Sequence, residues 1–335
     1  MLNQFSRTEL LYGKEAMERL ANARVAIFGL GGVGGYVGAL LADQYKNEEV
    51  TFVMRGERAA RTREQGLLLK SDYRGTHLVH PAQVVESAEG LPVQDYVIVC
   101  VKNYSLEEVC RTLSGCVDDH TIVIPIMNGA DPGDRVRQYL GKGLVLDSLI
   151  YIVAFRTPEE IVQQGNFAKV FIGKKNPSEV EQEKIAKTAE LMAAAGVDCF
   201  VADDIEAAIW RKYILNCAYN VSTAYYNSPI GPIRADKARA EEYEKLVYEA
   251  YAVALAKKIH VEQKDIDHII WRFYYDHAEN ASSSLQRDMG AGRVSELDTF
   301  CGYIVQEGHR LGVPVPVMER MYGEMKEREV KAGLR

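Results

Sequence analysis

The sequence lacks the features that would direct it to a membrane, to a nucleic acid or out of the cell. Its 335 residues contain no uninterrupted apolar run approaching the ~18 residues of a transmembrane helix. Acidic and basic residues alternate without a long run of one sign, so the formal net charge of −7 offers no basic surface to nucleic acid or lipid. We therefore expect neither a nucleic acid nor a membrane as a partner.

Cysteine motifs are absent as well. The six cysteines show no C-x-x-C spacing, and most lie in apolar surroundings where a free thiol behaves as a small hydrophobic side chain. Residues 1–20 carry charges of both signs and no apolar h-region, so we expect no secretory signal. These absences predict a cytoplasmic protein with no bound metal, and the chain is long enough for two domains, each with its own core.

A glycine cluster near the start is the most informative stretch. The apolar strand Val25–Phe28 is followed by glycines at the G-x-G-x-x-G spacing that opens a dinucleotide-binding helix. Gly29 would form the turn, Gly31 would let a pyrophosphate approach the backbone, and Gly34 would let the helix 36–45 pack closely on its strand. The residues expected to contact the cofactor in this turn are Gly29, Leu30, Gly31, Gly32, Val33 and Gly34.

The residue after the second strand indicates which dinucleotide is bound. The apolar run 50–54 completes a βαβ unit, and Arg55 follows it where an NAD-specific enzyme would place Asp or Glu. Arg55, with Arg58 nearby, suits a 2′-phosphate, so we expect NADP(H) as the cofactor. In the alternative interpretation, residues 55–58 form only a solvated loop, and Arg61 and Arg63 face water on the helix after it.

Two further buried strands end in polar residues. The apolar run 95–101 is followed by Lys102, and the run 121–127 is followed by Asn128. In open α/β sheets the ligand lies outside the carboxyl ends of the strands, where the glycine turn, Arg55, Lys102 and Asn128 would meet. A polar loop residue after a strand is common, so the prediction depends on their convergence.

The remaining pattern predicts an α/β Rossmann-like domain followed by an all-α domain. A hairpin is expected over residues 66–79, strands over 144–155, 169–172 and 197–201 with a turn near Gly165-Asn166, and a helix over 179–195. Beyond Asp203 helical segments dominate. We place the NADP-binding domain at residues 1–202, with residues 1–23 as an N-terminal arm, and the helical substrate and catalytic domain at 203–335.

The first helix of the second domain, over residues 205–226, contains a polar stripe. Lys212, Asn216 and Asn220 recur at a spacing of four and share one face. Buried asparagine is unfavourable without partners, which indicates a polar groove, although a solvent-facing stripe is the alternative. A protonated lysine is a suitable acid for reducing a carbonyl, because it can donate its proton to the developing alkoxide.

Two later segments add polar groups. Residues 279–286 are expected to bring hydroxyls and amides into another helix, and Ser295-Glu296-Leu297-Asp298 opens the next one. Ser295 with Asp298 also resembles a capping box, in which Glu296 would be an ordinary helix-start residue.

With these residues together, the sequence resembles the ketopantoate reductase family (2-dehydropantoate 2-reductases) from about Arg24 to its end. Several ordered motifs across both domains carry the resemblance. They are the glycine turn, Val101-Lys102, Asn128-Gly129, Trp210-Arg211-Lys212, Asn216, Asn220, Thr223-Ala224, Ser282-Ser283 before Leu285-Gln286, and Ser295-Glu296-Leu297-Asp298.

The resemblance implies NADPH-dependent reduction of a 2-oxo acid in a cleft between a Rossmann domain and a helical domain. Ketopantoate would give pantoate, on the route to pantothenate and coenzyme A. Lys212 would be the general acid, and Glu296 would hold the lysine and the substrate hydroxyl. The remaining implied contacts are Asn128 with nicotinamide and substrate, Asn216 and Asn220 with substrate, Ser283 with its carboxylate, and Arg55 and Lys102 with cofactor phosphates. Ser284 competes with Ser283 for the family's serine position.

Other functions remain open at this stage. Another branched 2-oxo acid could be the substrate, and a homodimer is plausible for a chain with an apolar helical domain. Residues 3–34 also resemble the opening of ubiquitin-activating-like adenylating enzymes, which bind ATP on a similar turn, but this likeness ends past residue 45. A catalytically silent NADP-binding sensor is the third possibility.

Overall fold

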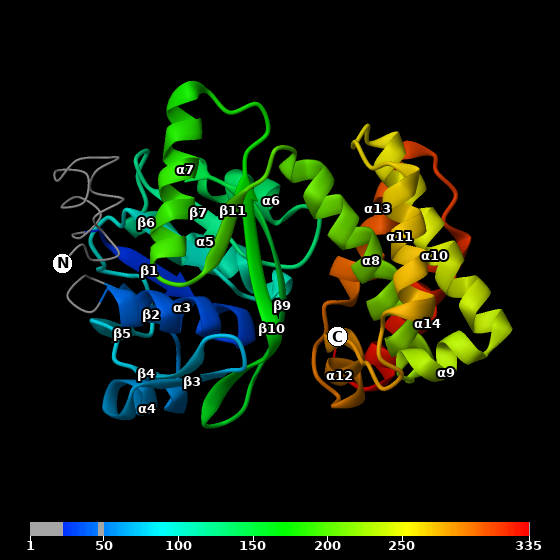
Figure 1. Ribbon diagram of the computed structural model, residues 1–335, viewed down its shortest axis with the longest axis horizontal. Helices are drawn as coiled ribbons and strands as arrows, with labels where there is room; N and C mark the ends of the chain where they lie inside the picture. Colours follow the sequence, from blue (N-terminus) through cyan, green and yellow to red (C-terminus); the bar gives the residue numbers. More distant parts are fainter. Residues whose placement is uncertain (1–22, 46–49, 335) are drawn as a thin grey trace. The chain divides into compact units, whose positions relative to one another are not determined.

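The computed structural model describes residues 23–45 and 50–334, so the expected arm at the N-terminus lies outside the described residues. Two compact units make up the chain (Figure 1). The first ends at Ile205 and excludes residues 128–130, which belong with residues 206–335 to the second. All strands of the described chain lie in the first unit, and the second is helical, as the sequence predicted.

A parallel sheet of six strands forms the centre of the first unit. Its strands are β1 (Val25–Phe28), β2 (Val50–Val53), β5 (Gln83–Val85), β6 (Tyr96–Val99), β7 (Ile122–Pro125) and β8 (Leu144–Val145). The order is β5-β2-β1-β6-β7-β8, and every pairing is parallel. Strand order reverses beside β1, and such a reversal opens the crevice in which dinucleotides bind.

A second sheet contains the remaining strands of this unit. They are β3 (Leu67–Ser71), β4 (Gly75–Val79), β9 (Asp147–Arg156), β10 (Glu160–Gly173) and β11 (Asp198–Val201). The order is β11-β10-β3-β4, and β9 pairs antiparallel with β10. The turn expected at Gly165-Asn166 is wrong. The chain turns between Arg156 and Glu160, and Gly165 (φ +80°) lies inside β10 where the register with β9 shifts.

Helix α3 (Gly32–Gln44) contacts strands of both sheets, which explains why it is apolar nearly all round. It begins four residues before the predicted start at residue 36. Two of its glycines permit the close packing. A Cβ on Gly35 would lie 2.5 Å from the side chain of Ile161 in β10, and one on Gly38 would lie 3.2 Å from Phe52 in β2.

Other helices complete the first unit. They are α4 (Glu57–Gln65), η1 (Asn103–Ser105), α5 (Leu106–Leu113), η2 (Ser114–Cys116), α6 (Pro132–Leu140) and α7 (Glu179–Ala194). Side chains of α5 and α6 join a separate core cluster with Val97, Val99 and Val123 of the parallel sheet. Helix α7 begins at a capping box formed by Ser178 and Glu181 and packs on β11.

The second unit consists of α8 (Ile205–Tyr226), α9 (Ile230–Ala235), α10 (Lys237–Ala256), α11 (Gln263–Tyr275), α12 (Ser284–Gly290), the π-helical turn η3 (Asp298–Gly302), α13 (Tyr303–Leu311) and α14 (Pro316–Lys331). Helix α8 has the predicted bounds. The helix expected over residues 279–286 is wrong at its start, because residues 279–283 form a loop and Ser283 caps α12. Asn and Ser favour turns and caps over helix interiors, which accounts for this difference.

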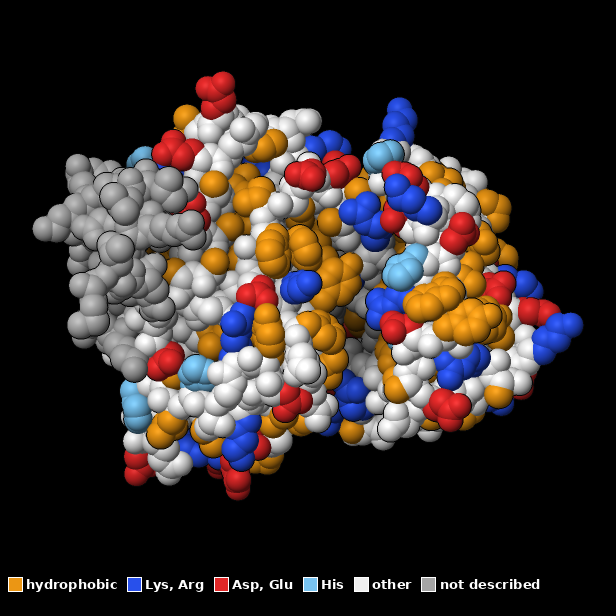
Figure 2. Space-filling view, in the orientation of Figure 1, with side chains coloured by type: hydrophobic (Ala, Val, Ile, Leu, Met, Phe, Trp, Pro, Cys, Tyr) orange, Lys and Arg blue, Asp and Glu red, His pale blue; other side chains and the backbone are white. Residues whose placement is uncertain are grey.

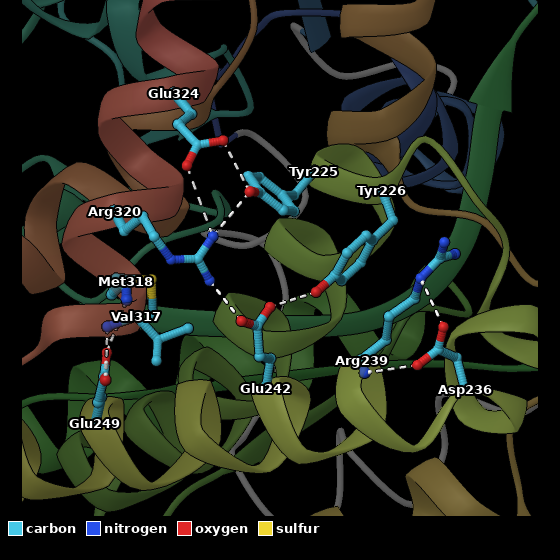
Figure 3. A network of polar contacts seen from close by, with 10 residues as sticks. All are labelled: Tyr225, Tyr226, Asp236, Arg239, Glu242, Glu249, Val317, Met318, Arg320 and Glu324. Carbon is cyan, nitrogen blue, oxygen red and sulfur yellow. Dashed lines mark hydrogen bonds and ion pairs between the residues drawn. The ribbon is translucent and has the colours of Figure 1, made fainter.

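A polar network joins α8, α10 and α14 near the C-terminal end of α8 (Figure 3). The guanidinium of Arg320 donates to the Tyr225 hydroxyl at 2.8 Å and to a carboxylate oxygen of Glu242 at 2.6 Å. The carboxylate of Glu249 accepts two backbone N–H groups from the first turn of α14, at 2.9 and 2.8 Å. The network therefore fixes the end of the helix that contains the polar stripe.

The surface offers no broad patch of one charge on the face drawn in Figure 2, where acidic and basic side chains are interspersed on each unit. Within residues 23–45 and 50–334, none of the helices combines the length and the hydropathy that crossing a bilayer requires.

Candidate functional site

The glycine turn of the first unit has the form that its spacing predicted. Gly29 has φ +83°, and a Cβ there would lie 2.6 Å from the Cys100 carbonyl oxygen. A Cβ on Gly34 would lie 2.3 Å from the carbonyl oxygen of Gly29. A Cβ on Gly31, in contrast, would have no atom within 4 Å apart from those of its chain neighbours. The turn is therefore packed tightly on its inner side and open at Gly31, the glycine that a pyrophosphate would approach.

The start of α3 provides donors beside this opening. The first bond into the helix runs from the Gly35 N–H to the Gly31 carbonyl at 2.8 Å. The N–H groups of Gly32, Val33 and Gly34 come before it and have no helical acceptor, as at the start of any helix. Such groups bind phosphate well, because the helix dipole adds a partial positive charge. The turn thus fits a dinucleotide.

Arg55 and Lys102 lie at the carboxyl ends of β2 and β6, as predicted. The exposed Arg55 side chain donates to Glu108 at 2.9 Å and to the carbonyl of Glu86 at 3.3 Å. Lys102 stands just before η1 with an extended backbone. Arg58 makes the contact with the turn itself, donating to the Leu30 carbonyl at 2.5 Å. The segment after β2 is therefore attached to the glycine turn through Arg58, while residues 55–57 are exposed.

The second unit brings together residues far apart in the sequence. The ammonium of Lys212 on α8 donates to Oδ1 of Asn128 at 3.3 Å. The pKa of Lys212 is lowered to about 8, because burial lowers it and the negative charge of nearby Glu296 offsets only part of that effect. Glu296 is itself buried, with 5% of its surface exposed. A lysine with this pKa is protonated near neutral pH and can still give up its proton, which suits a general acid.

Asn216 and Asn220 continue the polar stripe along α8. The side-chain amide of Asn220 donates to the Asn216 carbonyl at 2.9 Å. Its oxygen accepts the Ser284 hydroxyl at 3.3 Å and the Leu285 N–H at 3.4 Å. Because Asn220 is buried and Lys212 and Asn216 are partly buried, the stripe is not the solvent-facing row of the alternative interpretation.

The two candidate serines have different surroundings. Ser283 is buried, and its hydroxyl oxygen accepts the Gln286 N–H at 3.0 Å and the Thr223 hydroxyl at 2.7 Å. It serves as the N-cap of α12. Ser284 is only partly buried and contacts the polar stripe through Asn220. Of the two hydroxyls, that of Ser284 belongs to the stripe.

Glu329 is a residue that the sequence did not reveal. Its carboxylate accepts the hydroxyl of Ser295 at 2.5 Å, and the same hydroxyl oxygen accepts the Leu297 N–H at 3.2 Å. These bonds anchor the backbone on both sides of Glu296. The π-helical turn η3 follows directly, and such turns are frequent at functional sites. The glutamate lies in a charged stretch of α14, 34 residues from its partner, so no local pattern marks it.

These features define a class of protein. An open parallel sheet with a glycine turn for a dinucleotide, and a helical unit with a perturbed lysine, describe a nicotinamide-dependent reductase. In the described part of the chain no group of His, Cys, Asp or Glu side chains could bind a metal ion.

Comparison with known families specifies the class. The family "Ketopantoate reductase PanE/ApbA" matches residues 25–177, and its C-terminal counterpart matches residues 204–329. The chain belongs to the ketopantoate reductase family and is an NADP-dependent oxidoreductase, as the sequence predicted. This assignment replaces the alternative of an ATP-dependent adenylating enzyme.

Individual relatives agree. A 2-dehydropantoate 2-reductase of Caulobacter vibrioides is 30% identical over 298 residues, covering 87% of this chain and 94% of that one. An uncharacterised oxidoreductase of Bacillus subtilis is 26% identical over 306 residues, covering 91% of this chain and 98% of that one. Both alignments therefore span the two units.

Solved structures show the same fold. A ketopantoate reductase family protein from Ralstonia eutropha superposes with a TM-score of 0.83 at 26% identity, over 92% of this chain and 99% of that one. A D-mandelate dehydrogenase in complex with NADH and anilino(oxo)acetate superposes with a TM-score of 0.82 at 19% identity, over 93% and 100%. The second likeness concerns the fold alone.

Proposed function

We propose that this protein reduces a 2-oxo acid with NADPH, and that 2-dehydropantoate is its substrate, with pantoate as the product. The observation that supports this proposal most directly is the set formed by Lys212, Asn128 and Glu296 in one unit. The relatives named 2-dehydropantoate 2-reductase support the choice of substrate.

The roles of the residues follow from their chemistry. NADPH, when bound at the glycine turn, supplies the hydride that the carbonyl carbon accepts. Lys212 gives its proton to the carbonyl oxygen as negative charge develops there, which leaves a hydroxyl group and a neutral lysine. The Asn128 amide oxygen accepts one hydrogen of the ammonium and so orients it. The negative charge of Glu296 raises the pKa of Lys212 and so favours its protonated form, which is the form that acts as the acid.

The polar stripe would hold the substrate. Asn216, Asn220 and a serine at the start of α12 present amides and a hydroxyl, which can bind a carboxylate and a hydroxyl group. We propose Ser284 for this contact, because the Ser283 hydroxyl already caps α12 and accepts from Thr223. Arg55, Lys102, Asn128 and the turn residues Gly29, Leu30, Gly31, Gly32, Val33 and Gly34 remain the proposed contacts to the cofactor.

A spectrophotometric assay tests the function. Purified protein is mixed with NADPH and 2-dehydropantoate, and with a panel of branched and aromatic 2-oxo acids, and the nicotinamide absorbance is followed. Aromatic acids are included because a structure with this fold binds anilino(oxo)acetate. We expect turnover, with 2-dehydropantoate giving the highest kcat/KM. A lack of turnover with every acid would reject the proposal.

The Lys212→Ala variant tests the mechanism. We expect its rate of reduction to fall by a factor on the order of 10²–10⁴, the usual contribution of a general acid, while NADPH binding is retained. Arg211→Ala is the matched control, because Arg211 pairs with Asp265 at 3.8 Å and lies outside the set. A silent NADP-binding protein would bind the cofactor and show no rate for the substitution to change.

A further inference from the structure

Three arginines gather beside the glycine turn. Arg58 and Arg61 lie one turn apart on α4, and the Arg58 guanidinium donates to the Leu30 carbonyl inside the turn at 2.5 Å. Arg156 ends β9, the strand that passes over the start of α3. Its approach is close, since a Cβ on Gly32 would lie 2.5 Å from the carbonyl oxygen of Ala154.

None of these arginines forms an ion pair with a carboxylate in the part of the chain that the structure describes, unlike other arginines nearby. Arg55 is paired with Glu108 at 2.9 Å, and Arg63, on the same helix as Arg58, is paired with Glu86 at 3.5 Å. Burial, together with the positive charges of Arg156 and Arg61, lowers the pKa of Arg58 to about 10. At neutral pH the cluster therefore holds mutually repelling positive charges.

A cluster of positive charges with no carboxylate partner favours an anion as its ligand. Arginine binds phosphate in a bidentate manner, and a phosphate dianion would relieve the repulsion among the guanidinium groups. A dinucleotide bound at the glycine turn would bring its adenosine ribose to the end of β2, and α4, which carries Arg58, is the next helix after that strand. NADPH has a phosphate on this ribose, and NADH has a hydroxyl.

We propose that Arg58 and Arg156, supported by the charge of Arg61, bind the 2′-phosphate and give this protein its preference for NADPH over NADH. Arg55, the arginine that the strand end alone would indicate, contributes less because its side chain is exposed and already paired with Glu108. The inference rests on the proposed function only in requiring NADPH as the bound cofactor.

Equilibrium binding without substrate tests this proposal. Dissociation constants for NADPH and NADH are measured by nicotinamide fluorescence on the full chain, and those for 2′,5′-ADP and ADP by calorimetry. The variants are Arg58→Ala, Arg156→Ala and Arg55→Ala, with Arg63→Ala as the matched control from the same helix. Arg63 uses its side chain for Glu86 and the Val84 carbonyl.

We expect Arg58→Ala and Arg156→Ala each to raise the dissociation constants for NADPH and 2′,5′-ADP by roughly tenfold or more. A tenfold change corresponds to about 1.4 kcal/mol of binding free energy. Affinity for NADH and ADP should remain within about twofold, because the lost contact is to the 2′-phosphate. Arg55→Ala should have a smaller effect, and Arg63→Ala should bind like the wild type.

Two results would overturn the proposal. In one, Arg55→Ala removes the preference for NADPH while Arg58→Ala and Arg156→Ala behave like the control. In the other, Arg156→Ala lowers the affinity for NADPH and for NADH equally, which would mean that Arg156 contacts the pyrophosphate that both cofactors share. Arg58→Ala could disturb the turn, because it removes the contact with Leu30. Arg156 is exposed, so Arg156→Ala should keep the fold and tests the contact to the 2′-phosphate independently. A protein that binds NADPH selectively and reduces no 2-oxo acid would reject the proposed function and leave this inference intact.

Discussion

The ammonium of Lys212 donates to the side-chain oxygen of Asn128 at 3.3 Å, although 84 residues separate the two in the chain. Glu296 adds a negative charge from a third segment, and burial opposes the charge on the lysine. The pKa of about 8 is the balance of these effects. Because this pKa lies close to neutral pH, the protonation of Lys212 can be followed by measuring rates as a function of pH.

The pH dependence of reduction should follow Lys212. Because the general acid must be protonated, kcat/KM for reduction should fall as the pH rises through about 8. In Glu296→Gln the charge that raises the pKa of Lys212 is lost, so the decline should move to lower pH. Initial rates measured from pH 6 to pH 10 test both statements. Glu324→Gln, a change in the network of Figure 3, should keep the wild-type profile, and a Glu296→Gln profile identical to the wild type would contradict the coupling.

Two glycines of the turn should respond differently to alanine. A Cβ on Gly34 would lie 2.3 Å from the backbone of Gly29, so Gly34→Ala should destabilise the fold by about 1–3 kcal/mol. Gly31 has φ −80° and open space around its Cβ position, so Gly31→Ala should fold normally. Its methyl group would still obstruct the pyrophosphate and raise the Kd for NADPH at least tenfold.

Thermal denaturation without and with NADPH separates these effects, because a ligand that binds only the folded state raises Tm. Gly31→Ala should match the wild-type Tm alone and lose the increase on adding NADPH. An intact NADPH response in Gly31→Ala would show that the pyrophosphate does not pass this residue.

Substitution of the two serines at the start of α12 should have different effects, one on stability and the other on substrate binding. Ser283→Ala removes the N-cap and the bond from Thr223, and should cost about 1 kcal/mol of stability with little change in KM. Ser284→Ala should leave stability nearly unchanged and raise KM for the 2-oxo acid. Urea denaturation and steady-state kinetics on both variants test this, and the opposite pattern would assign the substrate contact to Ser283.

Acid stability should depend on Glu307. The Arg310 guanidinium donates to its two oxygens at 2.8 Å each, Lys257 also contacts it, and these groups lower the pKa of Glu307 to about 2. Since the unfolded pKa is ~4.3, the stabilising contribution is complete above pH ~4.5 and declines as the pH falls toward 2. The free energy of unfolding of Glu307→Gln should therefore be ~2 kcal/mol lower than that of the wild type at pH 7, and the difference should shrink below pH ~4.5.

Urea denaturation at pH 7 and pH 3 measures that difference. The exposed pair of Glu183 and Lys187 on α7, at 2.6 Å, provides the control, and Glu183→Gln should leave stability nearly unchanged because solvent screens this pair. A Glu307→Gln deficit of equal size at both pH values would show that the carboxylate charge is not responsible.

Local sequence determined much of this protein. The order of apolar strands and glycines predicted β1, the turn and the dinucleotide fold, because an apolar run and the spacing of glycines are local properties that indicate a buried strand and a tight turn. Helix α8 has its predicted bounds, and its spacing of four placed Lys212, Asn216 and Asn220 on one face for the same reason. Asn128 was predicted from its place after a buried strand, and the family resemblance added the roles of Asn128 and Glu296.

Tertiary structure decided which partners these residues meet. Nothing near Ser295 in the sequence indicates that Glu329 accepts its hydroxyl, and nothing near Arg55 indicates that it pairs with Glu108 while Arg58 contacts Leu30. The assembly of β3, β4, β9, β10 and β11 into a separate sheet, with α3 contacting both sheets, was likewise not predictable. Hydrogen bonds and charges act over a few ångströms in space, and segments distant in sequence come within that range only when the chain has folded.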